Sequence, residues 1–185
     1  MDKLKINKLV LGQIKENCYI LECGENAVII DPGQDTEKII AFLKEKNLKP
    51  AVILLTHGHY DHCYSVKALQ ELGAKCYVHP LDAEKLHNKD NMEELFDKPF
   101  PKTNADEMLQ EGNQNFCGID MFVLHTPGHT SGSCCFVVGD VLFSGDTLFD
   151  GGYGRTDMAD GDFEKLKASL KKLKPYFGLK RLAGH

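Results

Sequence analysis

The segment Thr56-His57-Gly58-His59-Tyr60-Asp61-His62 gathers three imidazoles and a carboxylate directly after an apolar run at residues 51–55. In an extended stretch, side chains two residues apart point the same way, so His57 and His59 can converge on one metal ion as the chain leaves a strand. Asp61 and His62 face another direction, at the opening of a helix expected over residues 61–72. Two divergent pairs of ligand-type side chains indicate two neighbouring ions.

Further ligand-type residues recur downstream, each after a short apolar run. They lie in Thr126-Pro127-Gly128-His129-Thr130-Ser131-Gly132-Ser133, in Ser144-Gly145-Asp146-Thr147-Leu148-Phe149 and in Gly184-His185. A single group of histidines before a helix can be a set of surface residues or caps. The recurrence at several strand ends favours a metal site instead, because histidine clusters at ligand spacing are typical of such sites.

The order HxHxDH, TPGHTSGS, SGDTLF and a late GH resembles the metallo-β-lactamase superfamily over nearly the whole chain. Within it, the short length and the segment Gly154-Arg155-Thr156-Asp157 are most similar to the compact type II glyoxalase-like hydrolases. The resemblance implies a set of seven metal ligands: His57, His59 and His129 for one ion, Asp61, His62 and His185 for the other, and Asp146 as a bridge between them.

The resemblance also implies the chemistry. We expect a metal-dependent hydrolase that cleaves a thioester, hydroxyacylglutathione-like, with a hydroxide that bridges two divalent metal ions. Zinc is the expected metal, and iron and manganese also accept nitrogen and oxygen ligands. Such ions lower the pKa of bound water from ~15.7 toward ~7, so no serine or cysteine nucleophile is required. We expect Asp61 to orient this water and Asp146 to bridge the ions, which makes both catalytic residues.

The glycine-rich turn after Asp146 contains two candidates for substrate binding. Arg155 could bind a substrate carboxylate or pair with Asp157, because arginine forks serve both roles. Tyr153 is expected to line the same pocket. Longer glyoxalase II enzymes add a helical glutathione-binding domain after the last histidine, whereas this sequence stops at His185. We therefore expect a single domain over residues 1–185 without that helical domain, and a thioester substrate that need not contain glutathione.

Two other classes of function stay open at this point. The persulfide dioxygenases are similar in sequence and share the Gly-Arg-Thr-Asp motif; in that case His57, His129 and Asp146 would hold a single iron as a two-histidine, one-carboxylate triad. A non-catalytic metal-binding domain would take up metal without turnover. A zinc β-lactamase is disfavoured by Asp146, since the commonest subclass has a cysteine there.

Composition agrees with a single globular enzyme domain. The chain has 185 residues, of which 42% are hydrophobic and 26% charged, and a net charge of −5. This acidic balance argues against a nucleic-acid partner, and the lysines at residues 165–174 are expected to form a solvated helix face. No apolar run reaches membrane-spanning length, so we expect no membrane partner. We expect a small-molecule substrate. The sequence carries no signature of an oligomeric state.

Seven cysteines form no CxxC pair, which indicates reduced thiols and, with the lack of a secretion signal, a cytoplasmic location. Cys63, directly after the first ligand cluster, could be a soft extra ligand or a buried thiol, and the second interpretation is favoured. Cys134 and Cys135 lie in an apolar run and are expected in the core.

The elements that must position these residues alternate between strands and helices. Strands are predicted at residues 4–11, 18–21, 27–30, 51–55, 76–78, 121–124, 134–138, 141–143 and 179–182. Helices are predicted at residues 36–46, 61–72 and 162–173, the last with Phe163, Leu166, Leu170 and Leu173 on one stripe. Residues 80–114 are expected to form short helices and a surface loop over the site. The pattern indicates an α/β fold, which by resemblance becomes a four-layer αβ/βα sandwich of two mixed sheets flanked by helices.

Overall fold

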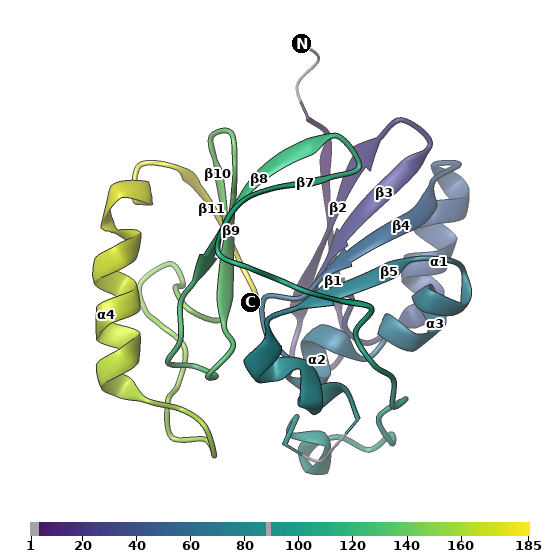
Figure 1. Ribbon diagram of the computed structural model, residues 1–185. Coiled ribbons are helices and arrows are strands. Elements are labelled where there is room, and N and C mark those ends of the chain that lie inside the picture. Colours follow the sequence, from purple (N-terminus) through teal and green to yellow (C-terminus); the bar gives the residue numbers. More distant parts are fainter. Residues whose placement is uncertain (1–3, 88–89) are drawn as a thin grey trace.

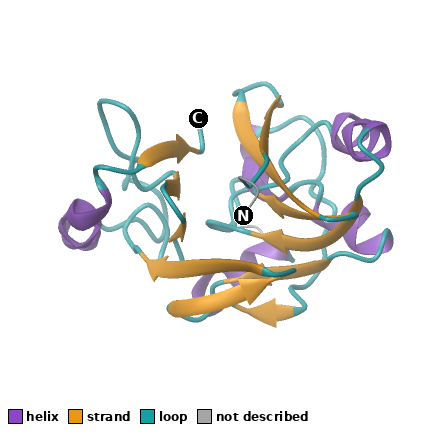
Figure 2. Ribbon diagram, turned by 90° about the horizontal axis from the view of Figure 1, so that it is seen from above, coloured by secondary structure: helices purple, strands orange, loops and turns teal. Residues whose placement is uncertain are grey.

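The computed structural model describes residues 4–87 and 90–185 and shows two mixed β-sheets packed face to face, with helices on both outer faces (Figure 1, Figure 2). The first sheet has the strand order β1 (Ile6–Leu11), β2 (Glu16–Cys23), β3 (Asn26–Ile30), β4 (Lys49–Leu54), β5 (Lys75–Val78) and β6 (Glu107–Met108). Its first three strands are antiparallel, and β3 to β6 run parallel.

The second sheet is an antiparallel meander with one parallel strand added at its edge. Its order is β11 (Lys180–Ala183), β10 (Val141–Gly145), β9 (Cys134–Val138), β8 (Ile119–His125) and β7 (Gly112–Phe116). The helices are α1 (Thr36–Glu45), α2 (Tyr60–Cys63), α3 (Val66–Glu71) and α4 (Phe163–Leu173), with short 3₁₀ segments η1 (Pro80–Leu86), η2 (Glu93–Leu95) and η3 (Lys174–Tyr176).

The alternation of side chains along the strands builds the layers. In β2, Tyr19 and Leu21 pack into the core between the sheets, whereas Cys18 and Ile20 pack toward α1 and α3 on the outer face. Because both faces of this strand are covered, its central residues 18–21 are all apolar. Each such buried aliphatic side chain stabilises the fold by about 1.5–3 kcal/mol. The predicted α/β fold of two mixed sheets flanked by helices is confirmed.

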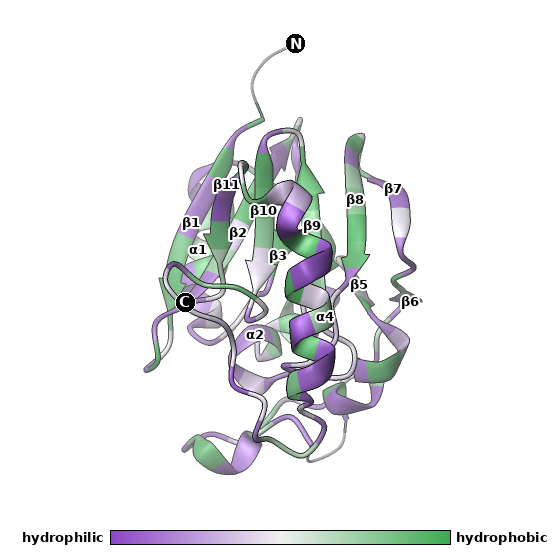
Figure 3. Cartoon of the chain, turned by 90° about the vertical axis from the view of Figure 1, so that its left-hand side faces the viewer, coloured by the Kyte–Doolittle hydropathy of each residue, from purple (hydrophilic) through white to green (hydrophobic). Residues whose placement is uncertain are grey.

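Helix α4 covers the second sheet (Figure 3). It begins one residue later than predicted because Asp162 is its cap, with the carboxylate accepting a hydrogen bond of 3.0 Å from the Lys165 amide. Its buried residues are Leu166, Ser169 and Leu173. Phe163 was predicted in the buried stripe, and that is wrong, since it is 45% exposed. The lysines at residues 165–174 are exposed, as predicted.

The prediction of one continuous helix over residues 61–72 is wrong, because the chain forms two short helices there, α2 and α3. The break lies at Tyr64 and Ser65. The Ser65 amide donates to the carbonyl of Pro32, and its hydroxyl donates to the carbonyl of Gly33. These bonds to the β3–α1 loop replace the continuous helical ladder and attach the ligand-bearing α2 to the first sheet.

Residues 80–114 contain the expected short helical segments η1 and η2, but also the strands β6 and β7, which were not predicted. Residues 88–89 of this region lie outside the described part of the chain. Strand β7 reads Gly-Asn-Gln-Asn-Phe and is an edge strand with mostly exposed or half-exposed residues. Such a polar strand carries no apolar period that would reveal it.

No helix in residues 4–87 and 90–185 combines the length and the apolar character needed to cross a membrane.

Candidate metal centre

Five segments bring the ligand-type side chains to one edge of the sandwich. His57 and His59 follow β4, Asp61 and His62 lie in α2, and the other three follow strands of the second sheet: His129 after β8, Asp146 after β10 and His185 after β11. In Figure 1 the chain end at His185 lies between the two sheets, above α2. Strand ends from both sheets therefore meet at the same place.

The seven side chains form overlapping groups of possible ligands. Within each group, one ligand atom per residue lies within 4.8 Å of the others: His57, His59 and His129; His57, His62 and Asp146; Asp61, His62 and His185. The first and third groups are the two ion sites predicted from the sequence. All of the predicted ligands are brought together, although their binding of metal stays a prediction.

Asp146 lies between the two predicted ion sites. Its Oδ2 is 3.6 Å from His129 Nε2 and 3.5 Å from His185 Nε2. Its Oδ1 is 3.4 Å from His62 Nε2. Gly184 permits this approach, because a Cβ at that position would lie 2.1 Å from Asp146 Oδ1. The carboxylate thus reaches ligands of both sites, as a bridging ligand must.

Three buried polar atoms in the cluster have no hydrogen-bond partner: His57 Nε2, His62 Nε2 and Asp146 Oδ1. His62 Nε2 lies 3.2 Å from Asp61 Oδ2, close enough for an ion pair but without hydrogen-bond geometry. A buried polar atom without a partner costs about 1–3 kcal/mol, so several at one place need an explanation. Metal coordination would satisfy all three atoms, and the nitrogen and oxygen donor set suits zinc, iron or manganese.

Hydrogen bonds to the other ring nitrogen orient the histidines. His62 Nδ1 donates to Asp31 Oδ2 at 3.0 Å, and Thr56 Oγ1 donates to the same oxygen at 2.7 Å. That hydroxyl in turn accepts from His57 Nδ1 at 3.1 Å. With Nδ1 occupied in this way, Nε2 is left for a metal, the arrangement common in metalloproteins.

The same pattern extends to the second sheet. His129 Nδ1 donates to the carbonyl of Arg155 at 2.8 Å, and His185 Nδ1 donates to that of Ile14 at 3.2 Å. Asp31 was missed in the sequence, where Asp31-Pro32-Gly33 was interpreted only as a turn. The available signal was a lone aspartate at the end of the strand next to the one that leads into His57.

Burial and charge set opposite protonation states within the cluster. Burial, with the neighbouring imidazoles, holds the pKa of His57 well below its usual range and lowers the pKa of His59 to about 3. Burial also acts to lower the pKa of His62, but Asp61, Asp146 and Asp31 outweigh it and raise that pKa well above its usual value. The charged His62 lowers the pKa of both Asp61 and Asp146 against the effect of burial. Neutral imidazoles and ionised carboxylates are the forms that bind metal.

Asp82 joins two ligand loops that are far apart in the sequence. Its carboxylate accepts hydrogen bonds of 2.8 Å each from the Gly58 amide, the Gly132 amide and the Thr130 hydroxyl. Gly58 lies between His57 and His59, and Thr130 follows His129. Asp82 is fully buried. It was not predicted from the sequence, because it lies in the region interpreted as a surface loop.

The predicted substrate contacts lie at the surface. The Arg155 guanidinium forms a two-point ion pair with Asp157, with both distances 2.7 Å, which is one of the two roles left open. Tyr153 is 51% exposed and lies against Phe163. In the described part of the chain, no hydrogen bond or ion pair joins either side chain to a predicted ligand, so their binding of substrate stays a prediction. Cys63 is buried and donates to the carbonyl of His59 at 3.0 Å, as expected of a structural thiol.

The sequence profile of the metallo-beta-lactamase superfamily matches residues 11–185. The chain belongs to this superfamily. Its members are in general hydrolytic enzymes with a metal-binding histidine cluster. Among curated relatives, hydroxyacylglutathione hydrolase GloC of Haemophilus influenzae is 35% identical, with 93% of this chain and 85% of the relative covered.

Solved structures of the superfamily match the whole fold. The B3 metallo-beta-lactamase BLEG-1 is 35% identical, with a TM-score of 0.90 and coverage of 98% of this chain and 91% of that one. TTHA1623 in a di-iron-bound form is 38% identical, with a TM-score of 0.87 and coverage of 97% and 91%. ETHE1 from Myxococcus xanthus is 25% identical, with a TM-score of 0.81 and coverage of 98% and 75%.

Proposed function

We propose that the protein is a dinuclear metallohydrolase that cleaves a thioester of the hydroxyacylglutathione type. The observation that carries the proposal is the position of Asp146, whose two oxygens lie within 3.6 Å of Nε2 atoms from both predicted ion sites. A single ion held by His57, His129 and Asp146 would leave the approach of Asp146 to His62 and His185 without a role. The similarity to GloC, named as a hydroxyacylglutathione hydrolase, supports the choice of substrate.

In this proposal His57, His59 and His129 hold one divalent ion, Asp61, His62 and His185 hold the other, and Asp146 bridges them. Two such ions supply a water that is ionised near neutral pH and polarise the carbonyl under attack. Zinc is the proposed metal. Iron is supported by the di-iron form of TTHA1623, and manganese suits the same donors.

The chain's own residues then have separate tasks. Asp61 Oδ2 lies 3.2 Å from His62 Nε2 and 3.3 Å from His185 Nε2, which supports a role for this carboxylate in orienting a nucleophilic water. A thiolate leaves without a general acid, because it is a weak base. The Cys63 thiol next to the cluster is a poor nucleophile, since burial raises its pKa well above the usual range and it already donates a hydrogen bond to the carbonyl of His59.

A mononuclear iron persulfide dioxygenase is the second candidate. The similarity to ETHE1 keeps it in view, as does the sequence resemblance noted above. In that enzyme class His57, His129 and Asp146 would hold one iron, and His62 would act only as a neighbour of the site. His62→Ala separates the two functions, because it should abolish dinuclear hydrolysis and spare much of a mononuclear oxygenation.

We also propose the partners and the cellular location of the enzyme. The acidic net charge of −5 supports a small-molecule substrate over a nucleic-acid partner, and we propose no membrane partner. A cytoplasmic location is supported by the seven cysteines, all of which are free thiols.

The test is a panel of three reactions on protein purified without added metal: hydrolysis of S-lactoylglutathione, hydrolysis of nitrocefin, and oxygen uptake with glutathione persulfide. Turnover of the thioester alone is the expected result. Oxygen uptake without hydrolysis would replace the proposal with the dioxygenase, and nitrocefin cleavage without thioester turnover would replace it with the lactamase activity named for BLEG-1. A metal-loaded protein inactive in all three reactions would point to a non-catalytic metal-binding domain.

A further inference from the structure

Two of the seven cysteines differ from the others in their surroundings. Cys117 is exposed and Cys23 is only partly buried. The other five are buried: Cys18, Cys63, Cys76, Cys134 and Cys135. Buried thiols in apolar surroundings behave as small hydrophobic side chains and are chemically inert. Cys23 and Cys117 are therefore the cysteines that a reagent in solution can reach.

These two cysteines lie far apart in the sequence, but their side chains contact each other. Cys23 is the last residue of β2 in the first sheet, and Cys117 lies in the turn between β7 and β8 of the second. Burial and the neighbouring Cys117 thiol, which shares a hydrogen bond with it, raise the pKa of the Cys23 thiol to about 11. Cys23 also packs against the core cluster that contains Phe116 and Ile119, the residues on either side of the turn. The two thiols are thus neighbours across the interface between the sheets.

The turn that carries Cys117 has a defined conformation. Phe116 pairs with Ile119 across the hairpin. Cys117 and Gly118 form the two-residue loop between them, with φ angles of 52° and 83°. Positive φ at both central residues is the type I′ geometry, which matches the twist of the two strands. The Gly118 amide also donates to Asn115 Oδ1 at 3.0 Å. The hairpin therefore holds the backbone of Cys117 beside the end of β2.

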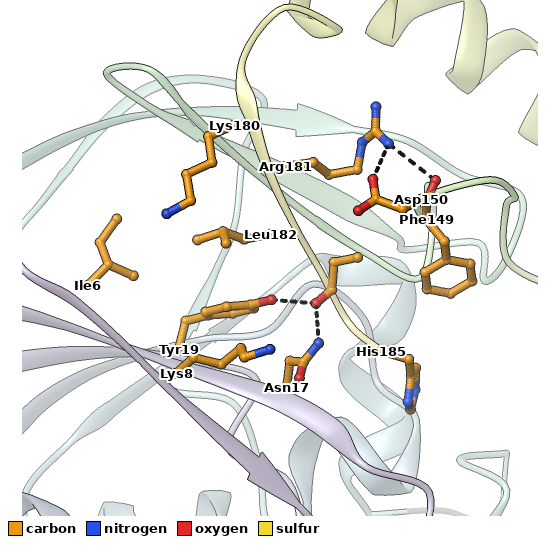
Figure 4. Close-up of a pocket in the computed structure, with 11 residues that line it drawn as sticks. Ile6, Lys8, Asn17, Tyr19, Phe149, Asp150, Lys180, Arg181, Leu182 and His185 are labelled. Carbon is orange, nitrogen blue, oxygen red and sulfur yellow. Dashed lines mark hydrogen bonds and ion pairs between the residues drawn. The ribbon is translucent and has the colours of Figure 1, made fainter.

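Strand β2 contacts the second sheet at both of its ends. At the first end, Tyr19 Oη and Asn17 Nδ2 donate to the carbonyl of Ala183 in β11, at 2.6 Å and 3.1 Å (Figure 4). Figure 4 shows His185, a predicted metal ligand, close to these bonds. At the other end, Cys23 meets the β7–β8 turn, which lies at the end of the sandwich away from α2 (Figure 1). A strand rises about 3.3 Å per residue, so Cys23 is roughly 20 Å from Asn17.

We propose that Cys23 and Cys117 form a reversible disulfide that joins the two sheets, with a small disulfide such as glutathione disulfide as the oxidant. Under reducing conditions the pair stays as two thiols, as in the structure. The bond would join the sheets at the end opposite the predicted metal centre. It would also enclose residues 23–117, and a disulfide that closes a long loop restricts the unfolded chain strongly.

The exchange takes two steps. Cys117, which is exposed, attacks one sulfur of the oxidant as the thiolate, so that a mixed disulfide forms and one glutathione thiolate leaves. Cys23 then loses its proton to solvent and attacks the Cys117 sulfur, which releases the second glutathione thiolate. The two leaving thiolates take up the two protons that the cysteines lose. One glutathione disulfide is thus reduced to two glutathione molecules as two protein thiols are oxidised to one disulfide.

Equilibration of the full-length chain with glutathione buffers of increasing oxidised fraction tests the proposal. Remaining thiols are blocked with N-ethylmaleimide, and peptide mass spectrometry should then find one disulfide, between Cys23 and Cys117, that disappears in excess reduced glutathione. Cys117→Ser should form no disulfide. Cys23→Ser should stop at the mixed disulfide, with glutathione on Cys117. A disulfide through another cysteine, a dimer linked by Cys117, or a wild type that forms no disulfide would overturn the proposal.

Thermal unfolding of the metal-loaded protein tests whether the bond joins the two sheets. The oxidised wild type should melt roughly 5–10 °C above the reduced wild type, because the crosslink restricts the unfolded chain. Cys117→Ser is the matched control, and the same oxidant should leave its melting temperature unchanged. Circular dichroism gives the melting curves. Equal melting temperatures for the oxidised and reduced wild type would contradict a crosslink between the sheets.

Discussion

The two halves of the predicted metal centre differ in how firmly they are built. His57, His59 and His129 are each at most 4% exposed, and Asp82 ties the loops that carry them to each other. The other half ends in His185, whose side chain is 28% exposed and whose Nδ1 donates to the carbonyl of Ile14. The first half is preorganised, whereas the second is more open to solvent. The ligands of the first half are thus held rigidly, whereas His185 of the second half is accessible to solvent.

Removing the ligand shared by both halves should have the largest effect. Asp146→Ala is expected to lower kcat/KM for thioester hydrolysis by ~1000-fold or more, because both ions lose a ligand and the bridge is gone. The measurement is steady-state hydrolysis of S-lactoylglutathione. Asp120→Ala, an exposed aspartate on β8, is the control and should retain full activity. Full activity of the Asp146→Ala protein would contradict the bridging role of Asp146.

Removing the hydrogen bonds of Asp82 should destabilise the part of the fold that holds His57, His59 and His129. Asp82→Ala leaves two buried amides and a buried hydroxyl without their acceptor, so we expect the free energy of unfolding to fall by about 3 kcal/mol. Chemical denaturation of metal-free protein measures this loss without any contribution from bound ions. Asp120→Ala should change the stability by less than ~0.5 kcal/mol. Equal stability of the two variants would mean that Asp82 does not join the loops in solution.

His185→Ala should disrupt the ion site of Asp61, His62 and His185 and leave the other ion site intact. We expect this variant to lose one of two Zn²⁺-binding events in a calorimetric titration of metal-stripped protein. Its unfolding free energy should change by less than ~1 kcal/mol, because the side chain is partly exposed and makes one hydrogen bond. Loss of both binding events would show that the halves do not form independently.

The smallest expected effect is on the stability of the fold at acid pH, and it involves His79 at the start of η1. His79 caps η1 through Nδ1, which accepts from the Leu81 amide at 3.3 Å, and its ring stacks on His125. Burial and the neighbouring His125 lower the pKa of His79 to about 4, against the opposing charge of Glu111. The unfolded chain therefore takes up this proton first, so the stability present above pH ~6.5 is lost as the pH falls toward ~4.

His79→Asn keeps an acceptor for the Leu81 amide without a titrating ring. The wild type should lose roughly 1 kcal/mol more stability than this variant between pH ~6.5 and ~4, a modest difference because the ring is half-exposed. Denaturation curves at several pH values give the comparison. Parallel pH profiles for the two proteins would contradict the lowered pKa.

Local apolar runs were enough to predict most strands. Histidine spacing indicated a metal site, and the full set of seven ligands came from the family resemblance. The local sequence could not reveal Asp82, which bonds to Thr130 across 48 residues of sequence. The break at Ser65 was missed for the same reason, since the competing acceptors belong to Pro32 and Gly33. Strand β7 was missed because a polar edge strand has no apolar period. Long-range polar contacts therefore account for much of what was not predicted.

The most direct test of a two-ion centre is the metal content of wild-type protein purified without added metal, measured by elemental analysis and divided by the protein concentration. We expect two divalent ions per chain, with thioester hydrolysis that falls as a chelator removes them. One ion per chain at full activity would contradict the bridging role of Asp146 and the second site at Asp61, His62 and His185.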